Sequence, residues 1–500
     1  MKIRYLLGVA ATAAAAVHQP AFAADAPSAY LRCDGSPNNV TGAETAGRVL
    51  AAATLIGLLL PQGEGADIGE RRSGQEGVAA CTEALASEGN DLRRAQLILA
   101  RAVHHIDAGS YDAAIADAQR VAQDRPAFAG TEGFRLSLGL SAMEIEATAL
   151  IAAGRAEQGI AKARDMSAAA PYDVVTAIRT AKFMQLGSTY GPDDAAYFDR
   201  LVRLYPFGLN DRANARQAAG DWRGAADDYE TLERLIASVI NRPAWGPLAQ
   251  AALVSALAGQ SERADAFATR AEAAIAVELE KTPNANVSSA RELLDLHRIV
   301  RRAQNSSSAE ARLLFAARSG WTVPSASAVG EVSRLLRRDA PAEQLTGLLA
   351  AEPGSFRADA VAAQRRVVVA GGTDPKRRFD VIRAFTPDRD FTGYSGNVWR
   401  DGRSRYFARE ENEEVHGRLV NMSRDGFGVA SGYALLLHSA VVAQREGRTS
   451  FMILPPVTQV GLGHVRTGNA GDEGMIEGLT FSAEEVIADL TPLIPRARRR

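Results

Sequence analysis

The sequence predicts a mainly α-helical protein in which a row of helical hairpins is followed by a small α+β domain. Three observations support this fold class. Residues 92–354 are rich in Ala, and their apolar residues recur at intervals of three and four, as on one face of a helix. Single Gly residues interrupt this pattern at similar places. After residue 378, Gly, aromatic and β-branched residues become more frequent.

The first 23 residues have the pattern of an export signal. Lys2 and Arg4 precede the apolar stretch Leu6 to Val17, and Ala21-Phe22-Ala23 has the small-x-small pattern of a cleavage site. We expect cleavage after Ala23, with an uncleaved anchor as the alternative, and a location in the bacterial periplasm. No Cys directly follows the apolar stretch, so lipid attachment is not expected.

Residues 24–91 are expected to form a helical region held by a disulfide. Cys33 and Cys81 are the two cysteines of the chain, and in an oxidising compartment they are expected to pair. A reactive thiol is the alternative. The segment Val49 to Leu60 between them is short for a membrane span, so we interpret it as a buried helix rather than a membrane-inserting segment.

Charge does not indicate a polyanionic partner for the chain. The 57 Lys and Arg residues nearly balance the 59 Asp and Glu residues, so no nucleic-acid partner is expected. The basic run 496–500 is interpreted as a solvated tail, with contact to anionic lipid as the alternative. Peripheral membrane contact is therefore compatible with the sequence but not required.

Four Gly residues are expected to separate the two helices of successive hairpins. Each is followed five positions later by a small residue that lets two helices approach closely, and a left-handed Gly would end the first helix. In two units a Pro, seventeen positions after the Gly, would stop the second helix. The four Gly residues are Gly109, Gly154, Gly220 and Gly259.

These offsets resemble the tetratricopeptide repeat, and "AGDWRGAADDYETL" at 219–232 is the best copy. The resemblance covers roughly residues 92–279, and later helices keep the hairpin rhythm without the motif. The interval from Pro126 to Pro171 exceeds the usual period of about 34 residues, so an extended helix or an extra turn is expected there. The resemblance implies a solenoid over 92–354 whose concave groove, lined by the first helix of each pair, binds a protein or peptide.

Candidate groove residues follow from this arrangement. Asn210, Asn214 and Gln217 lie at i, i+4 and i+7 of a first helix, and Glu144 and Thr148 occupy the equivalent stripe of an earlier pair. In peptide-binding members of the family, an Asn at the place of Asn214 contacts the ligand backbone. The Lys that binds a terminal carboxylate in those members is replaced here by Asn210, so no carboxylate clamp is expected. A merely solvated polar face is the alternative.

A helix or linker over 355–378 is expected to lead into a small α+β domain, 379–500. We predict strands at 378–385, 403–410, 413–422 and 449–456, a long helix at 426–448, and a final helix capped by Ser482. This domain resembles a family of small bacterial envelope lipoproteins of unknown function, through the residues 393–395, 433–436 and 483–490. The family's lipid-anchored Cys has no equivalent here, and the resemblance implies no activity.

No catalytic residues, cofactor or metal are predicted. His104 and His105 are adjacent on a helix and face different directions, and His297 is alone. Metal binding by the three histidines of the C-terminal domain is the alternative. The glycine-rich stretches at 371–375 and 468–474 are expected to be turns. An acidic cluster at a hairpin tip is expected to be solvated, with cation binding as the alternative; it comprises Glu410, Glu411, Glu413 and Glu414.

The sequence therefore favours an exported, non-enzymatic adaptor that binds a protein or peptide partner of the cell envelope. A structural envelope protein that contacts membrane or surface is one alternative. A hydrolase or transferase that uses the C-terminal domain is another, and its candidate residues are His416, His438, His464, Glu410 and Glu414.

Overall fold

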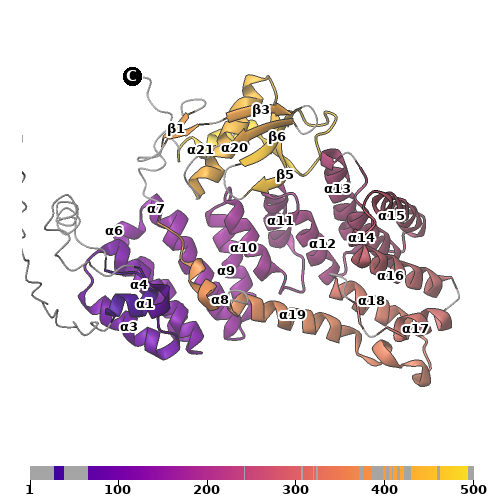
Figure 1. Ribbon diagram of the computed structural model, residues 1–500, viewed down its shortest axis with the longest axis horizontal. Coiled ribbons are helices and arrows are strands. Elements are labelled where there is room, and N and C mark those ends of the chain that lie inside the picture. The colour runs from indigo at the N-terminus through magenta and orange to yellow at the C-terminus, as the bar shows by residue number, and fades with distance from the viewer. Residues whose placement is uncertain are drawn as a thin grey trace, which may run out of the picture.

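The computed structural model describes residues 27–38, 66–240, 242–305, 308–318, 320–321, 325–370, 375–385, 398–400, 405–407, 409–413, 417–421, 429–458 and 462–493. Over these residues the protein is mainly helical, with a small antiparallel sheet near the C-terminus (Figure 1). The predicted export signal, the apolar segment Val49 to Leu60 and the basic run 496–500 lie outside the described residues.

The N-terminal helices are held together by a disulfide, as predicted. Cys33 in α1 (Ala29–Asp34) bonds to Cys81 in α3 (Gly74–Ser87), and the region also holds the short η2 (Ile68–Glu70). His104 of α4 (Asp91–Asp107) donates its Nε2–H to the Cys33 carbonyl oxygen at 2.7 Å. A Cβ atom at Gly77 would lie 2.3 Å from this ring, so Gly77 allows α3 to pack directly on His104.

Paired helices follow in chain order, and each pair packs against the next. The pairs are α4 with α5 (Tyr111–Asp124), α8 (Leu140–Ala152) with α9 (Ala156–Ala169), α10 (Val174–Met184) with α11 (Pro192–Leu204), α12 (Gly208–Ala218) with α13 (Trp222–Ile240), and α14 (Trp245–Leu257) with α15 (Ser261–Lys281). They are followed by α16 (Ser288–Gln304) and α17 (Ser308–Ala316).

The predicted role of the four Gly residues is confirmed. Gly109, Gly154, Gly220 and Gly259 all adopt positive φ angles, between 73° and 84°, where the chain reverses between two helices. Five positions later stand small buried residues. At one of them, Gly159, a Cβ atom would lie 2.8 Å from the Ala147 carbonyl oxygen, so this helix pair requires Gly there.

The extra length between Pro126 and Pro171 is taken up by additional helical turns. α6 (Pro126–Ala129) and α7 (Glu132–Phe134) precede a π-helical stretch at Arg135–Gly139, which continues into α8. This agrees with the extra turn expected from the sequence.

After α17 the chain turns back along the first helices of the pairs. α18 (Ala326–Arg337) packs against α12, α14 and α16, α19 (Pro353–Ala370) packs against α8 and α10, and η6 (Pro375–Val381) reaches α4 and α8. The short turns η4 (Ala342–Gln344) and η5 (Gly347–Ala350) connect α18 to α19. In Figure 1, α19 runs below the row of pairs. We call residues 325–385 the return segment.

The strand predicted at 378–385 is wrong. Its N-terminal part belongs to the 3-10 helix η6, and the residues after Val381 form no strand. Phe379 of η6 and Ile382 and Phe385 after it all pack against the hydrophobic core that includes α4 and α8. Residues 379–385 therefore lie on the helical pairs, although we had assigned them to the C-terminal domain.

The C-terminal α+β part contains the remaining strands. β1 (Val398–Arg400) pairs with β2 (Arg405–Phe407), and a five-stranded antiparallel sheet has the order β3-β4-β6-β5-β7. Its strands are β3 (Arg409–Glu413), β4 (Gly417–Asn421), β5 (Ser450–Thr458), β6 (Leu462–Gly468) and β7 (Thr480–Ser482). α20 (Val429–Arg445) and α21 (Ala483–Leu490) form as predicted, and the Ser482 hydroxyl caps α21 by accepting from the Glu485 backbone N–H.

This part differs from the sequence prediction in several details, and β1, β6 and β7 were not predicted. The stretch 403–410 is divided between β2 and β3 rather than forming one strand. Glu410, Glu411 and Glu413 lie within β3, paired with β4, and not at a hairpin tip. Glu414 and the residues 393–395 lie outside the described residues. The stretch 468–474 is a turn, with Gly471 and Gly474 at positive φ.

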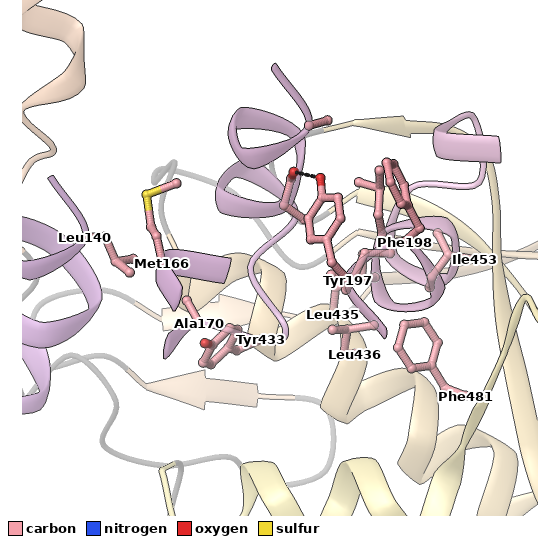
Figure 2. Close-up of a cluster of buried hydrophobic side chains, with 14 of the residues drawn as sticks. Leu140, Met166, Ala170, Tyr197, Phe198, Tyr433, Leu435, Leu436, Ile453 and Phe481 are labelled. Carbon is pink, nitrogen blue, oxygen red and sulfur yellow. Dashed lines mark hydrogen bonds between the residues drawn. The ribbon is translucent and has the colours of Figure 1, made fainter. Parts of the chain in front are cut away.

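The C-terminal part shares a hydrophobic core with the helical pairs. Figure 2 shows Leu435 and Leu436 of α20 beside Tyr197 and Phe198 of α11, and Tyr433 of α20 beside Ala170 at the end of α9. The Tyr197 hydroxyl, buried in this core, donates to the Ala177 carbonyl oxygen at 2.7 Å. Because apolar side chains from both parts fill one cluster, the sheet is fixed on the helical pairs rather than tethered beside them.

Replacing Cys33 and Cys81 together by Ala is expected to lower the free energy of unfolding by about 4 kcal/mol, because the disulfide closes a loop of 48 residues. Urea denaturation of the signal-cleaved protein would measure this. Reduced wild-type protein should approach the stability of the double variant. Equal denaturation midpoints for oxidised wild type and double variant would contradict the stabilising role.

Candidate functional site

The sequence-predicted groove residues lie on two first helices, as expected, but most of them are engaged by the protein itself. Gln217 of α12 is 2% exposed. Its Nε2 donates to the Tyr229 hydroxyl at 2.9 Å, and its Oε1 accepts from the Ser325 hydroxyl at 2.5 Å. Asn214 accepts from the Tyr229 hydroxyl at 3.2 Å. Gln217 and Asn214 therefore satisfy a buried Tyr and the start of the return segment.

Glu144 and Thr148 of α8 are engaged as well. Glu144 accepts from Arg179 Nη1 at 2.9 Å and lies 3.7 Å from Arg383 Nη2. The Thr148 hydroxyl donates to the backbone carbonyl of Glu144 at 2.9 Å. Neither side chain is positioned as a free ligand contact.

Side chains of α19 bind the backbone at the C-terminal ends of α8 and α10. Arg365 Nη2 donates to the Ala152 carbonyl oxygen at 3.0 Å, and Gln364 Nε2 donates to that of Lys182 at 2.9 Å. Arg357 donates to the carbonyl oxygens of Gln185 and Gly187. The last carbonyls of a helix have no partner within the helix, and cationic donors complement the negative end of its dipole. The return segment thus supplies caps to the pairs that it crosses.

Arg383 fixes the end of the return segment at the N-terminal end of α10. Its Nη1 lies 3.1 Å from Asp173 Oδ2 and donates to the Thr176 hydroxyl at 2.7 Å. Its backbone N–H donates to the Ser141 hydroxyl at 2.9 Å. Asp173 is 3% exposed, so Arg383 neutralises a buried carboxylate that also caps α10.

An open pocket of about 400 Å³ lies where α12, α14 and α16 begin. Its lining is mainly apolar and includes three aromatic side chains, Tyr205, Phe207 and Trp245. Polar side chains, among them Asn210, Asp211 and Gln250, also line it. Of the groove residues predicted from sequence, Asn210 is the one that reaches this pocket.

The two side-chain amides of this pocket are unengaged. Among the described residues, the side-chain amides of Asn210 and Gln250 form no hydrogen bond, in contrast to Asn214 and Gln217. One oxygen of Asp211 accepts from Gln185 Nε2 at 2.9 Å. Burial raises the pKa of Asp211, and the Gln185 hydrogen bond opposes this shift. Unengaged polar groups converging in an apolar pocket are the usual feature of a ligand site.

Sequence reasoning missed Trp245, Tyr205, Phe207, Asp211 and Gln250. Tyr205 and Phe207 directly precede α12, and Trp245 and Gln250 belong to the first helix of the next pair. The signal available was the aromatic pair flanking Pro206, just before the polar stripe that begins at Asn210.

The described residues contain no metal-ligand cluster. No group of three His, Cys, Asp or Glu side chains is arranged there to hold a metal ion. His438 is fully buried in α20, and His464 lies on β6, whereas His416 is outside the described part. Of the helices that are described, none combines the length and apolarity needed to span a bilayer.

Comparison with known proteins adds no family to this description. No protein-family model matches the chain, and no curated protein matches it in sequence. The functional interpretation therefore depends on the geometry of the molecule.

Replacing Gln217 by Ala is expected to lower the free energy of unfolding by about 2 kcal/mol, because it removes one hydrogen bond from the buried Tyr229 hydroxyl and one from the Ser325 hydroxyl. Asn210→Ala should change it by less than about 0.5 kcal/mol. Chemical denaturation would compare the two variants. An equal decrease in the free energy of unfolding for the two variants would contradict the distinction between engaged and unengaged amides.

Replacing Arg383 by Met is expected to lower the free energy of unfolding by about 3 kcal/mol, because the buried Asp173 carboxylate loses its cation. Backbone amides of residues 375–385 should also exchange with deuterium faster, which mass spectrometry of peptic fragments would measure. Arg366→Met, at an exposed position of α19, is the matched control and should change neither quantity. Unchanged exchange in the Arg383 variant would show that other contacts hold this segment.

Proposed function

We propose that the protein is an exported, non-enzymatic scaffold that binds a protein or peptide partner of the cell envelope on its tetratricopeptide-like row of helical pairs. The observation that carries this proposal is the pocket around Asn210, whose side-chain amides form no hydrogen bond among the described residues, whereas Gln217 on the same helix is bound by Ser325 of the return segment. The partner is therefore assigned to this pocket rather than to the whole inner face.

The chemistry of the pocket supports a peptide rather than a reaction. Side-chain amides can donate to and accept from a peptide backbone at once, as Asn210 and Gln250 would, and aromatic side chains supply contact area at little entropic cost. We keep for Asn210 the role of contacting a peptide ligand, which the sequence suggested for the groove. Asn214 instead accepts a hydrogen bond from the buried Tyr229 hydroxyl.

An exported location agrees with the disulfide and with the signal-like N-terminus. A disulfide between Cys33 and Cys81 persists in an oxidising compartment such as the periplasm. The proposal needs neither a membrane anchor nor a cofactor, and peripheral membrane contact is not part of it.

Replacing Asn210 and Gln250 together by Ala is expected to reduce recovery of the partner at least fivefold in affinity capture from periplasmic extract. Both amides lack hydrogen-bond partners among the described residues, so the thermal midpoint should stay within about 1 °C of wild type, as expected for unengaged surface groups. Gln158→Ala, at an exposed position of α9, is the control and should capture the partner normally.

The decisive readout is the amount of each captured protein, quantified by mass spectrometry against wild-type bait. A protein enriched on wild type and on the Gln158 variant but lost from the double variant is a partner of the pocket. Equal recovery on all three baits would refute binding at this pocket.

A further inference from the structure

Asp211 differs from the other partly or fully buried carboxylates of the helical pairs. Those carboxylates form ion pairs, for example Asp117 with Arg101 at 2.7 Å and Asp194 with Arg164 at 3.0 Å. Asp228 of α13 lies one helical turn before the pocket residue Leu232, and it is bound by Arg212 and Arg216. Asp211 has no ion pair within the described chain, and Gln185 is its one hydrogen-bond donor there.

The surroundings of Asp211 are aromatic and contain no basic group. Tyr205, Phe207 and Trp245 line the same pocket, and the rings of Tyr205 and Phe207 meet edge to face with centroids 5.8 Å apart. Among the described residues that line the pocket, none is Lys, Arg or His. The described lining of the pocket therefore supplies no cationic side chain to pair with the Asp211 carboxylate.

We propose that the pocket binds an ammonium group carried on an apolar chain, and that in the partner this group is the side chain of a lysine. Asp211 would pair with the ammonium, and the aromatic side chains would contact the methylene stem and the charge. The proposal rests on the scaffold function above and specifies the chemistry that the pocket recognises.

The geometry favours an ammonium over a guanidinium. Gln185 Nε2 already donates to Oδ1 of Asp211, so Oδ2 is the oxygen without a partner among the described residues, and a guanidinium would have to share Oδ1 with Gln185 to pair through both oxygens. An ammonium is a compact charge, and a single carboxylate oxygen can accept a hydrogen bond from it. The volume of about 400 Å³ exceeds an ammonium alone and leaves room for its stem and for the adjoining backbone beside Asn210 and Gln250.

The test uses the full signal-cleaved protein labelled with 5-fluorotryptophan. The chain has four Trp residues, and the Trp245→Phe variant identifies the fluorine resonance of Trp245. The probes are N-acetyl-lysine methylamide, its norleucine counterpart, which has a similar stem without the charge, and n-butylammonium. Shifts of the Trp245 resonance during titration give the dissociation constants.

The lysine probe is expected to bind at least tenfold tighter than the norleucine probe to wild-type protein. Asp211→Asn should bring the two dissociation constants within twofold of each other. Its thermal midpoint should be equal to or above that of wild type, because an unpaired carboxylate is removed from a partly buried site. Asp165→Asn, at an exposed position of α9, is the matched control and should retain the selectivity for lysine.

Equal affinity for lysine and norleucine probes in wild type would overturn the proposal, as would no shift of Trp245 with either probe up to 50 mM. Selectivity retained in the Asp211 variant would overturn the role of that carboxylate. Tighter binding of the capped lysine than of n-butylammonium supports a peptide as the source of the ammonium, and the reverse order supports a small free amine.

The two proposals fail in distinguishable ways. Loss of partner capture in the Asn210 and Gln250 double variant, together with normal capture by Asp211→Asn, would keep the scaffold function and reject the ammonium. Lysine selectivity in the titration, together with normal capture by both variants, would keep the ammonium site and reject partner binding there.

Discussion

The arrangement of the molecule depends on the return segment, which binds polar groups that the helical pairs leave unsatisfied. Helix ends expose carbonyl groups, and buried ends need partners. Arg365, Gln364 and Arg357 donate to such carbonyls at the ends of α8 and α10, and Arg383 neutralises Asp173 where α10 begins. α18 contributes in a different way, by burying an apolar face against α12, α14 and α16. One stretch of chain thus joins pairs that are distant in sequence.

This constraint decides where a partner can bind. The face formed by the first helices of the pairs can bind a ligand only where no other part of the chain covers it. Residues 325–385 contact much of this face. The C-terminal sheet and α20 join the pairs through a shared core, which Figure 2 shows. The pocket between α12, α14 and α16 keeps unengaged polar groups. Free polar groups, rather than polar groups in general, therefore identify the candidate site.

The hairpins could be predicted from sequence because their determinants are local. Gly220 must adopt a positive φ, and Ala225 must be small, whatever else the chain does. The return segment could not be predicted, because the contacts of Arg357 with Gln185 and of Ser325 with Gln217 join residues more than 100 positions apart. The same limit explains why the stripe of Asn210, Asn214 and Gln217 was correctly placed on one helix, while the structural role of its last two members was not foreseen.

The contrast between Asp228 and Asp211 extends this reasoning to charge. Both carboxylates are withdrawn from water by the packing of α12 and α13, and burial raises the pKa of each. Arg212 and Arg216 compensate Asp228, so its charge is part of the internal network. Asp211 receives one amide hydrogen bond and no cation from the described chain. A protein gains nothing in stability from such a group, because a buried carboxylate without a cation costs free energy. The lysine that we propose in the partner would supply the cation that the described chain does not.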